Sequence, residues 1–443
     1  MQARWRDLLE LADRTAARNE HLLPRRRLRT MLLRGRLAPA VHQRASSRRL
    51  NGVTDDGLRA NAESWNAQLP AIFVGCDACP AIPRFLSLFL VFMEIEFAGA
   101  AREVTGSCHI VRMNGKTVLL DFGMFQGRRS ETRAKNATLP LEVREIDAVV
   151  LSHAHIDHAG RLPLLTANGY ANPIYCTAAT RDLSAVMLAD SAHIQEKDAE
   201  FLARRQREAV PPLYGMRDAT AAVDRMVGLP YDTWFDVVPG MRAMFTDAGH
   251  ILGSASVTLE CTEQGTRKQV VFSGDVGRRG LPIIRDPKPP TGGADVVLLE
   301  STYGNRDHEP VAGAREQLAR VVSETAARGG RVLVPAFSVG RTQELVYDLH
   351  ILAREGKIPE VPIYIDSPLA IDATTVFAMH PEIFDRTEDL VQKVQDLFKF
   401  PLVRYTREAT ESKALNSQHG PMVVIAASGM AEAGRILHHL AHG

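Results

Sequence analysis

Cysteine is scarce in this sequence, with five residues among 443. A small and odd number of thiols does not suit the disulfide framework of a secreted domain and fits a reducing compartment, so we expect a cytoplasmic protein. Cys76 and Cys79 form a Cys-x-x-Cys pair, but no second pair and no histidine lies near it. This pair alone therefore predicts no metal site.

A long apolar run is also missing. Residues 85–92 are apolar, but this run is far shorter than the roughly 20 residues that span a bilayer. It also lies too far along the chain for a signal peptide. We therefore expect no membrane association.

The chain has almost no net charge, at +1. A polyanion would therefore have to be bound by a local basic groove, because the overall field does not attract it. The charge is unevenly divided. Residues 1–92 contain 15 arginines, no lysine and 8 acidic residues, which gives +7, whereas the remainder has 38 basic and 44 acidic residues, which gives −6.

Residues 1–92 differ from the rest of the chain in other ways. Their arginines concentrate at 25–29, and the segment has no sustained strand alternation. It can be a basic nucleic-acid-binding arm or a targeting segment. A third hypothesis, which we favour, is that translation starts at Met93, where strand-like sequence begins. We expect residues 1–92 to be an Arg-rich extension that is disordered or not native.

The most informative stretch follows an apolar run at 148–151, which predicts a buried strand. His153, His155, Asp157 and His158 come directly after it, and a helical pattern begins at 160. Two histidines two positions apart can point into one cavity, and the following aspartate and histidine can serve a second ion. Imidazole and carboxylate ligands suit zinc or a similar divalent ion.

Further candidate ligands lie downstream. His250 stands in a glycine-bounded loop before a strand at 255–261, and Asp275 follows a buried strand that ends at 272. They can supply a third imidazole for one ion and a carboxylate that bridges two ions about 3.5 to 4 Å apart. Asp121 ends a strand at 116–121, and a carboxylate there can hold a metal-bound histidine in orientation.

The His-x-His-x-Asp-His pattern resembles the signature of the metallo-β-lactamase superfamily. To this point a lactamase, a thioesterase, a lactonase and a nuclease fit equally well. Glu300 then ends an apolar strand and is followed by Ser-Thr-Tyr-Gly. In this order the motifs are similar to those of the β-CASP branch, which processes RNA. Glu300 can pair with a histidine that acts as general acid.

Strands and helices alternate after Gly304. The strands are predicted at 331–337, 361–365 and 422–427, and the helices at 340–354, 369–380 and 431–442. Continuous apolar strands with helical crossovers favour a parallel sheet covered on both faces. This is similar to the β-CASP domain.

Two helix starts in this region carry small residues and arginine. They comprise Gly340 and Arg341 at the first, and Ser428, Gly429 and Arg435 at the second. Free backbone N–H groups and the helix dipole favour a phosphate there, and the arginines can add contacts. The alternative is ordinary helix capping with the arginines facing solvent.

The resemblance implies an α/β fold, with a metallo-β-lactamase αββα sandwich at 93–303 and a Rossmann-like β-CASP domain at 304–443. That domain is expected to be incomplete at its C-terminus, because the histidine motifs with which the family continues do not follow the last strand and helix. The implied function is a zinc-dependent RNA-processing nuclease with RNA as its partner and with a homodimer as an open option. Its activity is expected to be impaired by the truncation.

The resemblance also assigns the site residues. The catalytic residues are Asp157, Asp275 and Glu300. The first ion takes His153, His155, His250 and Asp275, and the second takes Asp157, His158 and Asp275, so that one ion instead of two is an option here. Two alternatives stay open, a metallo-hydrolase of a small ester or lactam and a non-catalytic RNA-binding scaffold.

Overall fold

The computed structural model describes residues 93–206, 211–307, 313–384 and 397–442. The expectations for residues 1–92 lie outside this part of the chain. The described residues fall within one unit by their mutual contacts. None of the described helices combines the length and the apolar character that crossing a membrane requires.

The first sheet has six strands in the order β1-β2-β3-β4-β5-β6. The first three pair antiparallel, and the four strands from β3 to β6 run parallel to one another. Asn114 and Gly115 join β2 to β3 with positive φ at both positions, as a tight hairpin turn requires, which confirms the predicted turn. The strands are β1 (Glu94–Phe97), β2 (His109–Met113), β3 (Lys116–Leu120), β4 (Ala148–Val150), β5 (Ile174–Thr177) and β6 (Met226–Leu229).

The second sheet has the order β11-β10-β9-β8-β7 and is antiparallel except between β10 and β11. Its strands are β7 (Trp234–Val238), β8 (Met241–Asp247), β9 (Ala255–Glu263), β10 (Thr266–Phe272) and β11 (Val296–Leu298). Alternate residues of the first sheet, such as Val118 and Leu120, share one apolar cluster with Phe245 and Val257 of the second. The two sheets therefore pack face to face as a sandwich.

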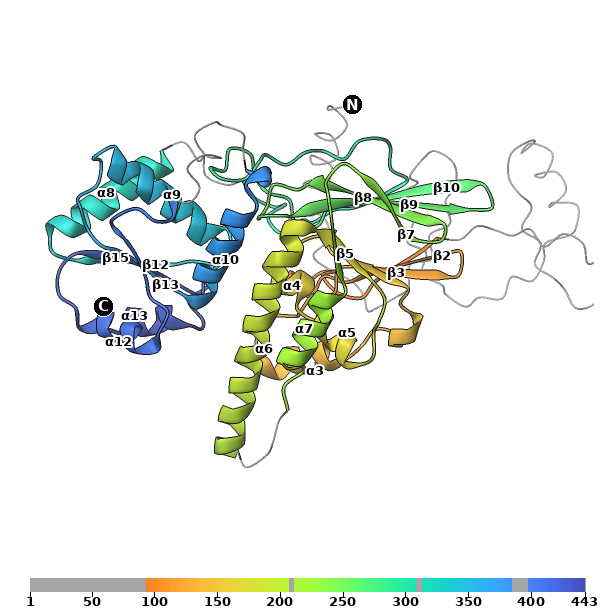
Figure 1. Cartoon of the computed structure of the whole chain (residues 1–443), viewed down its shortest axis with the longest axis horizontal. Helices are drawn as coiled ribbons and strands as arrows, with labels where there is room; N and C mark the ends of the chain where they lie inside the picture. The colour runs from red at the N-terminus through yellow and green to blue at the C-terminus, as the bar shows by residue number, and fades with distance from the viewer. Residues whose placement is uncertain (1–92, 207–210, 308–312, 385–396, 443) are drawn as a thin grey trace, which may run out of the picture. The chain divides into compact units, whose positions relative to one another are not determined.

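The other face of the first sheet is covered by helices. Leu119 and Val149 point to this side and join a second apolar cluster with Leu162 and Leu188. Both faces of the first sheet are therefore buried, as its continuous apolar strands require. The helices are α3 (Arg129–Ala137), α4 (Ile156–Ala159), α5 (Leu162–Ala167), α6 (Ala178–Gln206) and α7 (Met216–Asp224) (Figure 1).

A third sheet follows in the chain, with four parallel strands in the order β12-β15-β13-β14. This confirms the predicted parallel sheet with alternating helices. Its strands are β12 (Arg331–Pro335), β13 (Ile363–Asp366), β14 (Val403–Tyr405) and β15 (Met422–Ala426). Its helices are α8 (Ala314–Ala327), α9 (Arg341–Arg354), α10 (Pro368–Met379), α12 (Ala409–Ser417) and α13 (Arg435–His442), with α8 and α9 on one face and α12 and α13 on the other (Figure 1).

The last helix begins later than expected. A helix was predicted from 431, but α13 begins at Arg435. Ala431 and Gly434 both have positive φ, at 51° and 78°, and a right-handed helix does not accommodate such values. Residues 427–434 therefore form a loop between β15 and α13.

One apolar cluster links the third sheet to the sandwich. It contains Val339, Val346 and Ile365 of the parallel-sheet region together with Ala154 and Ile251 of the sandwich. Ala154 lies between His153 and His155, and Ile251 follows His250. The parallel-sheet region is therefore packed against the two loops that carry the predicted metal ligands.

Candidate metal centre

The first pair of ligands leaves the end of β4. Ser152 donates its backbone N–H to Asp121 Oδ1 at 2.7 Å, which holds the chain as it turns away from the strand. His153 is buried, and His155 caps the start of α4. Both imidazoles are thereby held on a short segment between a strand and a helix, which is how a preorganised site is built.

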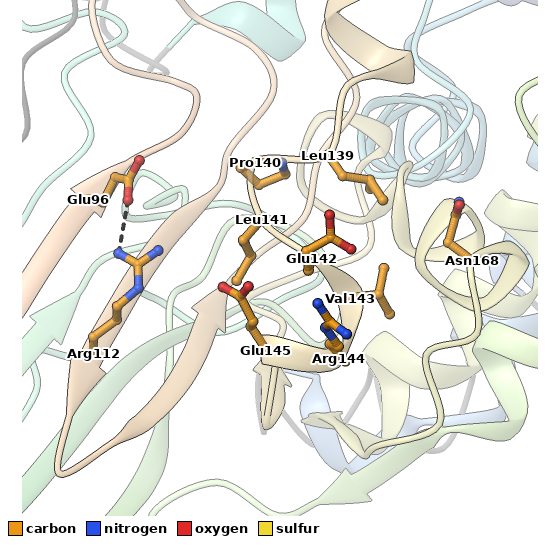
Figure 2. A pocket seen from close by; sticks show the side chains of 10 residues that line it. All are labelled: Glu96, Arg112, Leu139, Pro140, Leu141, Glu142, Val143, Arg144, Glu145 and Asn168. Atoms are coloured by element: carbon orange, nitrogen blue, oxygen red, sulfur yellow. Dashed lines mark hydrogen bonds and ion pairs between the residues drawn. The ribbon is translucent and has the colours of Figure 1, made fainter.

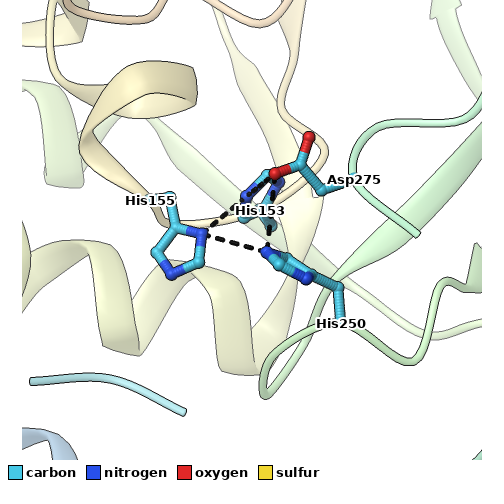
Figure 3. A group of neighbouring side chains, drawn as sticks. All are labelled: His153, His155, His250 and Asp275. Carbon is cyan, nitrogen blue, oxygen red and sulfur yellow. Dashed lines mark hydrogen bonds and ion pairs between the residues drawn. The ribbon is translucent and has the colours of Figure 1, made fainter. Parts of the chain in front are cut away.

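Four side chains from three loops converge at this point, namely those of His153, His155, His250 and Asp275 (Figure 3). His155 Nδ1 lies 3.1 Å from His153 Nε2 and 3.1 Å from His250 Nε2. Asp275 Oδ2 lies 3.8 Å from His153 Nε2 and 3.5 Å from His250 Nε2. Within the described residues this is the group of histidine, cysteine and carboxylate side chains whose donor atoms all lie within 4.8 Å of one another.

These distances fit a divalent cation. Ligand atoms about 2.0 to 2.2 Å from a tetrahedral zinc ion stand about 3.3 to 3.6 Å apart. Four of the six pairs of donor atoms here are separated by 3.1 to 3.8 Å, and all four atoms lie within 4.8 Å of one another. The donor set of three imidazoles and one carboxylate also suits zinc or a similar ion. The sequence-predicted first-ion residues are thus brought together in space.

A serine sets the tautomer of His153. Ser152 Oγ donates to Asp121 Oδ2 at 2.9 Å and lies 3.0 Å from His153 Nδ1. Since its proton is directed at the carboxylate, the hydroxyl accepts a hydrogen bond from Nδ1–H. The lone pair of His153 Nε2 is then left to face the other ligands. The sequence did not predict this role for Ser152.

Asp157 and His158 extend the cluster on one side. His158 Nε2 lies 3.2 Å from Asp275 Oδ1 and 4.0 Å from Asp157 Oδ2. Asp275 therefore faces the first-ion histidines with one carboxylate oxygen and His158 with the other. This is the arrangement that a bridging carboxylate would need, and the second-ion role of these residues remains a prediction.

Asp121 lies behind His158. It is fully buried, and its Oδ2 accepts from His158 Nδ1 at 2.7 Å and from Ser107 Oγ at 3.0 Å. Its other oxygen accepts from the backbone of Ser152. One carboxylate therefore links β3 to both parts of the ligand loop.

The charges within the cluster shift its pKa values in opposite directions. Burial and the neighbouring imidazoles lower the pKa of His153 well below its usual range and that of His155 to about 3, so both are neutral and ready to bind a metal ion. Burial disfavours the charged forms of His158 and Asp275, but their mutual attraction outweighs it. The pKa of His158 is raised and that of Asp275 is lowered. Burial raises the pKa of Asp157.

Two glycines allow the ligand loops to approach closely. A Cβ at Gly123 would lie 1.6 Å from the carbonyl oxygen of Asp157, and a Cβ at Gly277 would lie 1.6 Å from that of Gly249. Gly249 precedes His250, whose N–H is held by Ser254 Oγ at 3.0 Å. Only glycine fits at these two crossings, and each crossing fixes a ligand loop.

Comparison with known proteins gives the family. The metallo-beta-lactamase superfamily model matches residues 101–307, and the Beta-Casp domain model matches residues 342–443. A ribonuclease of Thermus thermophilus is 38% identical over 356 residues, which are 79% of this chain and 76% of that protein. This chain belongs to the β-CASP branch of the metallo-β-lactamase superfamily.

Other relatives of this β-CASP protein carry a different name. The transcription termination factors FttA of Lokiarchaeum and of Methanosarcina mazei are 31% and 32% identical to it, over 77% and 79% of this chain. The chain spans about half of their length, at 52% and 53%. Membership of the superfamily implies divalent metal binding, in agreement with the ligand cluster.

Glu300 braces the Asp275 loop of the β-CASP protein. Its Oε1 accepts from the Val276 N–H at 2.9 Å, and its Oε2 accepts from Thr302 Oγ1 at 2.8 Å. Its own N–H donates to Ser273 Oγ at 3.0 Å. These contacts fix the residues on both sides of Asp275. The predicted pairing of Glu300 with a histidine is not among the contacts of the described residues. A role for Glu300 in general-acid catalysis remains a prediction.

The two predicted phosphate sites of the β-CASP domain differ. Gly340 caps α9, and a Cβ there would lie 3.2 Å from Ile251 Cγ2, so this helix starts beside the loop of His250. Arg341 has a half-exposed side chain that pairs with Glu344 at 3.0 Å. This site lies next to the metal centre.

Arg435, at the second predicted site, points inward. Its Nη1 lies 2.7 Å from the buried carboxylate of Asp366, and its Nη2 donates to the Arg407 carbonyl at 2.7 Å. The alternative in which this arginine faces solvent is therefore wrong. Ser428 donates its N–H to the Ala433 carbonyl at 3.2 Å, within the loop before α13. Phosphate binding by Ser428, Gly429 and Arg435 stays a prediction.

A pocket of about 690 Å³ lies elsewhere in the β-CASP protein (Figure 2). It opens near the start of β4, whereas the metal ligands follow the end of that strand. Its lining mixes charges of both signs and contains none of the predicted site residues. The lining residues are Glu96, Arg112, Leu139, Pro140, Leu141, Glu142, Val143, Arg144, Glu145 and Asn168.

Proposed function

We propose that this chain is a zinc-dependent ribonuclease that hydrolyses phosphodiester bonds of RNA. The observation that carries the proposal is the convergence of three imidazoles and one carboxylate, whose donor atoms all lie within 4.8 Å of one another, with Asp157 and His158 beside them. The name of the Thermus thermophilus relative supports RNA as the substrate.

The site residues fall into ligands of two ions and a residue that orients one of these ligands. His153, His155, His250 and Asp275 would hold one ion, and Asp157 and His158 with Asp275 would hold a second. A bound divalent ion supplies Lewis acidity, which polarises a phosphoryl oxygen and stabilises the charge that develops on it. Asp121 keeps the proton of His158 on Nδ1, so that Nε2 faces the site.

Asp157 is the carboxylate that this chain offers for proton transfer. It is largely buried, which raises its pKa, and a carboxylate beside the reacting atoms can take up a proton. Glu300 holds the Asp275 loop through the Val276 N–H. Arg341, beside the His250 loop, can meet the phosphates of a strand on either side of the scissile bond.

RNA fits the surroundings of the site better than a small ester or lactam does. A small-molecule hydrolase would need a compact pocket and no third sheet against the ligand loops, but here Val339 of the parallel-sheet region and Ile251 of the sandwich belong to one apolar cluster. A non-catalytic scaffold would have no need of four converging ligands. The expected cytoplasmic location and the option of a homodimer do not bear on the choice of substrate. The dimer is tested by the molar mass in solution.

The substrate class is tested by comparing three reactions of the purified full chain with added zinc. The probes are end-labelled single-stranded RNA, nitrocefin as a lactam, and p-nitrophenyl acetate as an ester. We expect RNA cleavage that His153→Ala abolishes and His193→Ala, a histidine on α6 outside the cluster, leaves intact. Hydrolysis of nitrocefin or of the ester without cleavage of RNA would overturn the proposal in favour of a small-molecule hydrolase.

A further inference from the structure

Phe337 is an exposed aromatic side chain at the end of a strand of the parallel sheet. It follows β12 directly after the buried Ala336, yet 54% of its surface is exposed. A phenylalanine that is half exposed forgoes much of the stabilisation that full burial would give. A single exposed apolar side chain is common on protein surfaces, so the significance of this one depends on its surroundings.

The backbone of Phe337 is fixed. Its carbonyl accepts from Thr342 Oγ1 at 2.8 Å and from the Thr342 N–H at 3.3 Å. The next carbonyl, that of Ser338, accepts from the buried amide of Gln343 at 3.1 Å. The segment that carries the ring is therefore tied to the first turn of α9.

Gly429 supports one side of the ring. A Cβ at Gly429 would lie 2.9 Å from Phe337 Cδ2 and 3.0 Å from Cε2. The absence of a side chain at 429 thus lets the backbone lie against the ring. The ring is braced from this side, and about half of its surface is exposed to solvent. Met430, the next residue, is itself 68% exposed and adds a flexible apolar side chain at the same loop.

A short series of contacts connects the segment that carries Phe337 to the candidate metal centre. Val339, two residues after Phe337, belongs to the same apolar cluster as Ile251. Gly340 also lies against Ile251, the residue that follows the candidate ligand His250 in the chain. A polymer bound at the metal centre would therefore pass near the ring.

One cationic side chain near the ring, which pairs with Glu344, is available for a polyanion. Arg341, four residues on, has a half-exposed guanidinium, which can contact a phosphate. The chain as a whole has a net charge of +1, so the attraction must be local. Aromatic rings beside cationic side chains are the means by which proteins bind single strands without reading their sequence.

We propose that Phe337, supported by Gly429, stacks on one nucleobase of the single-stranded RNA whose backbone passes the metal centre. The inference rests on the proposed ribonuclease function and adds a base-binding subsite to it. Since every base has a flat face, this subsite would tolerate all four bases. Its removal would weaken binding of the strand without changing the metal ligands.

The test is a coupling experiment between Phe337 and single bases. A 12-nucleotide phosphorothioate RNA, which resists cleavage, is labelled with fluorescein, and an abasic site is placed at each position in turn. Fluorescence anisotropy gives the dissociation constants for the full chain with zinc and for Phe337→Ala, Phe337→Tyr and Gly429→Ala. Phe201→Ala, an equally exposed phenylalanine near the far end of α6, is the matched control. Thermal unfolding verifies that each variant is folded.

We expect one or two abasic positions to weaken binding to the wild-type chain about 5- to 100-fold, the range that base stacking on an aromatic ring gives. Phe337→Ala should bind the intact strand about as weakly as the wild-type chain binds the abasic strand. In this variant, an abasic site at that position should cause no further loss of affinity. Phe337→Tyr should restore the penalty, and Phe201→Ala should not affect it.

Two other outcomes overturn the inference in distinguishable ways. If the wild-type chain binds RNA but the abasic penalties are the same in Phe337→Ala, the stacking subsite is wrong and the ribonuclease proposal survives. If the wild-type chain binds no RNA at all, both are wrong.

Discussion

The Nδ1–H of His158 donates to Oδ2 of Asp121 at 2.7 Å, across 37 residues of sequence. This bond directs His158 Nε2 toward Asp275 Oδ1, 3.2 Å away. The same Asp121 carboxylate holds the Ser152 hydroxyl, through which it orients His153. A single residue at the end of β3 thus sets the direction of two imidazoles.

Replacing Asp121 by asparagine should therefore weaken metal binding. An amide has one acceptor oxygen in place of two, so it cannot serve the serine, the backbone and His158 together. We expect zinc affinity to fall about 10- to 100-fold, measured by competition with a chromophoric chelator. Asp147→Asn, which changes a carboxylate at the start of β4 that bonds Lys116, is the control. Equal zinc affinities for Asp121→Asn and the wild-type chain would contradict the account.

Gly277→Ala should displace the His250 loop. Its Cβ would lie 1.6 Å from the Gly249 carbonyl oxygen, so the loop must move away. We expect the free energy of unfolding to fall by about 1 to 3 kcal/mol and zinc to bind more weakly. Gly293→Ala provides the comparison, because a Cβ there meets nothing within 4 Å. Similar losses for both variants in urea unfolding would show that the close crossing at Gly277 is unimportant.

Asp366 should stabilise the parallel-sheet region at neutral pH. Its buried carboxylate accepts from His439 Nε2 at 2.7 Å, from Ser412 Oγ at 2.5 Å and from Arg435 at 2.7 Å. Removing one partner of a buried ion pair costs about 3 to 5 kcal/mol, and we expect Asp366→Asn to lose that amount in urea unfolding at pH 7. Asp372→Asn, which breaks an exposed ion pair with Arg407, should lose far less.

The Asp366 effect should also depend on pH. Burial opposes its charge, but the bonds from His439, Ser412 and Arg435 outweigh it and lower its pKa below 3.8. A carboxyl with a lowered pKa contributes its stability above the unfolded value and loses it as the pH falls through the folded value. The difference between wild type and Asp366→Asn should therefore shrink below about pH 4. A difference that stays constant down to pH 3 would contradict the charged interaction.

Asp247 should have the opposite pH dependence. It is buried, its Oδ2 has no hydrogen-bond partner among the described residues, and burial raises its pKa to about 6. Since its pKa when unfolded is near 3.8, the folded state binds the extra proton between these values and loses stability as the pH rises. Above pH 6 the free energy of unfolding is therefore lower by about 3 kcal/mol than it is below pH 4.

Asp247→Asn, which cannot ionise, should escape this loss. Relative to wild type it should gain about 3 kcal/mol in unfolding free energy between pH 4 and pH 7, measured in urea with a metal chelator present. Asp232→Asn, at an exposed carboxylate that pairs with Lys288, is the control and should show no such gain. A variant-to-wild-type difference that is flat across this range would mean that Asp247 ionises normally.

The sequence predicted the candidate ligand cluster because the local chain brings most of its members together. His153, His155, Asp157 and His158 share one strand end, and that loop needs no long-range information. His250 and Asp275 were predicted from glycine-bounded loops at strand ends, where polar side chains of a sheet protein gather. Three of the four strands of the parallel sheet were also predicted, since β12, β13 and β15 are largely apolar runs, whereas β14, with the sequence Val-Arg-Tyr, was missed.

The remaining features depend on partners far apart in sequence. Arg435 has an inward position because of Asp366, 69 residues earlier, and no local pattern reveals such a pair. Asp121 could be expected to orient a histidine, but only the fold shows that the histidine is His158. The role of Glu300 in holding Val276 depends on the parallel pairing of β10 with β11. Likewise, the packing of Gly429 on Phe337 joins segments that are 92 positions apart in the sequence.

The central claim is that the ligand cluster binds metal ions that cleave RNA. Its most direct test is the metal content per chain of purified protein, measured together with cleavage of a labelled single-stranded RNA on the same sample. We expect bound zinc, cleavage that a chelator removes and zinc restores, and loss of cleavage in Asp157→Ala. Protein that binds no zinc, or that cleaves RNA equally well after complete removal of the metal, would contradict it.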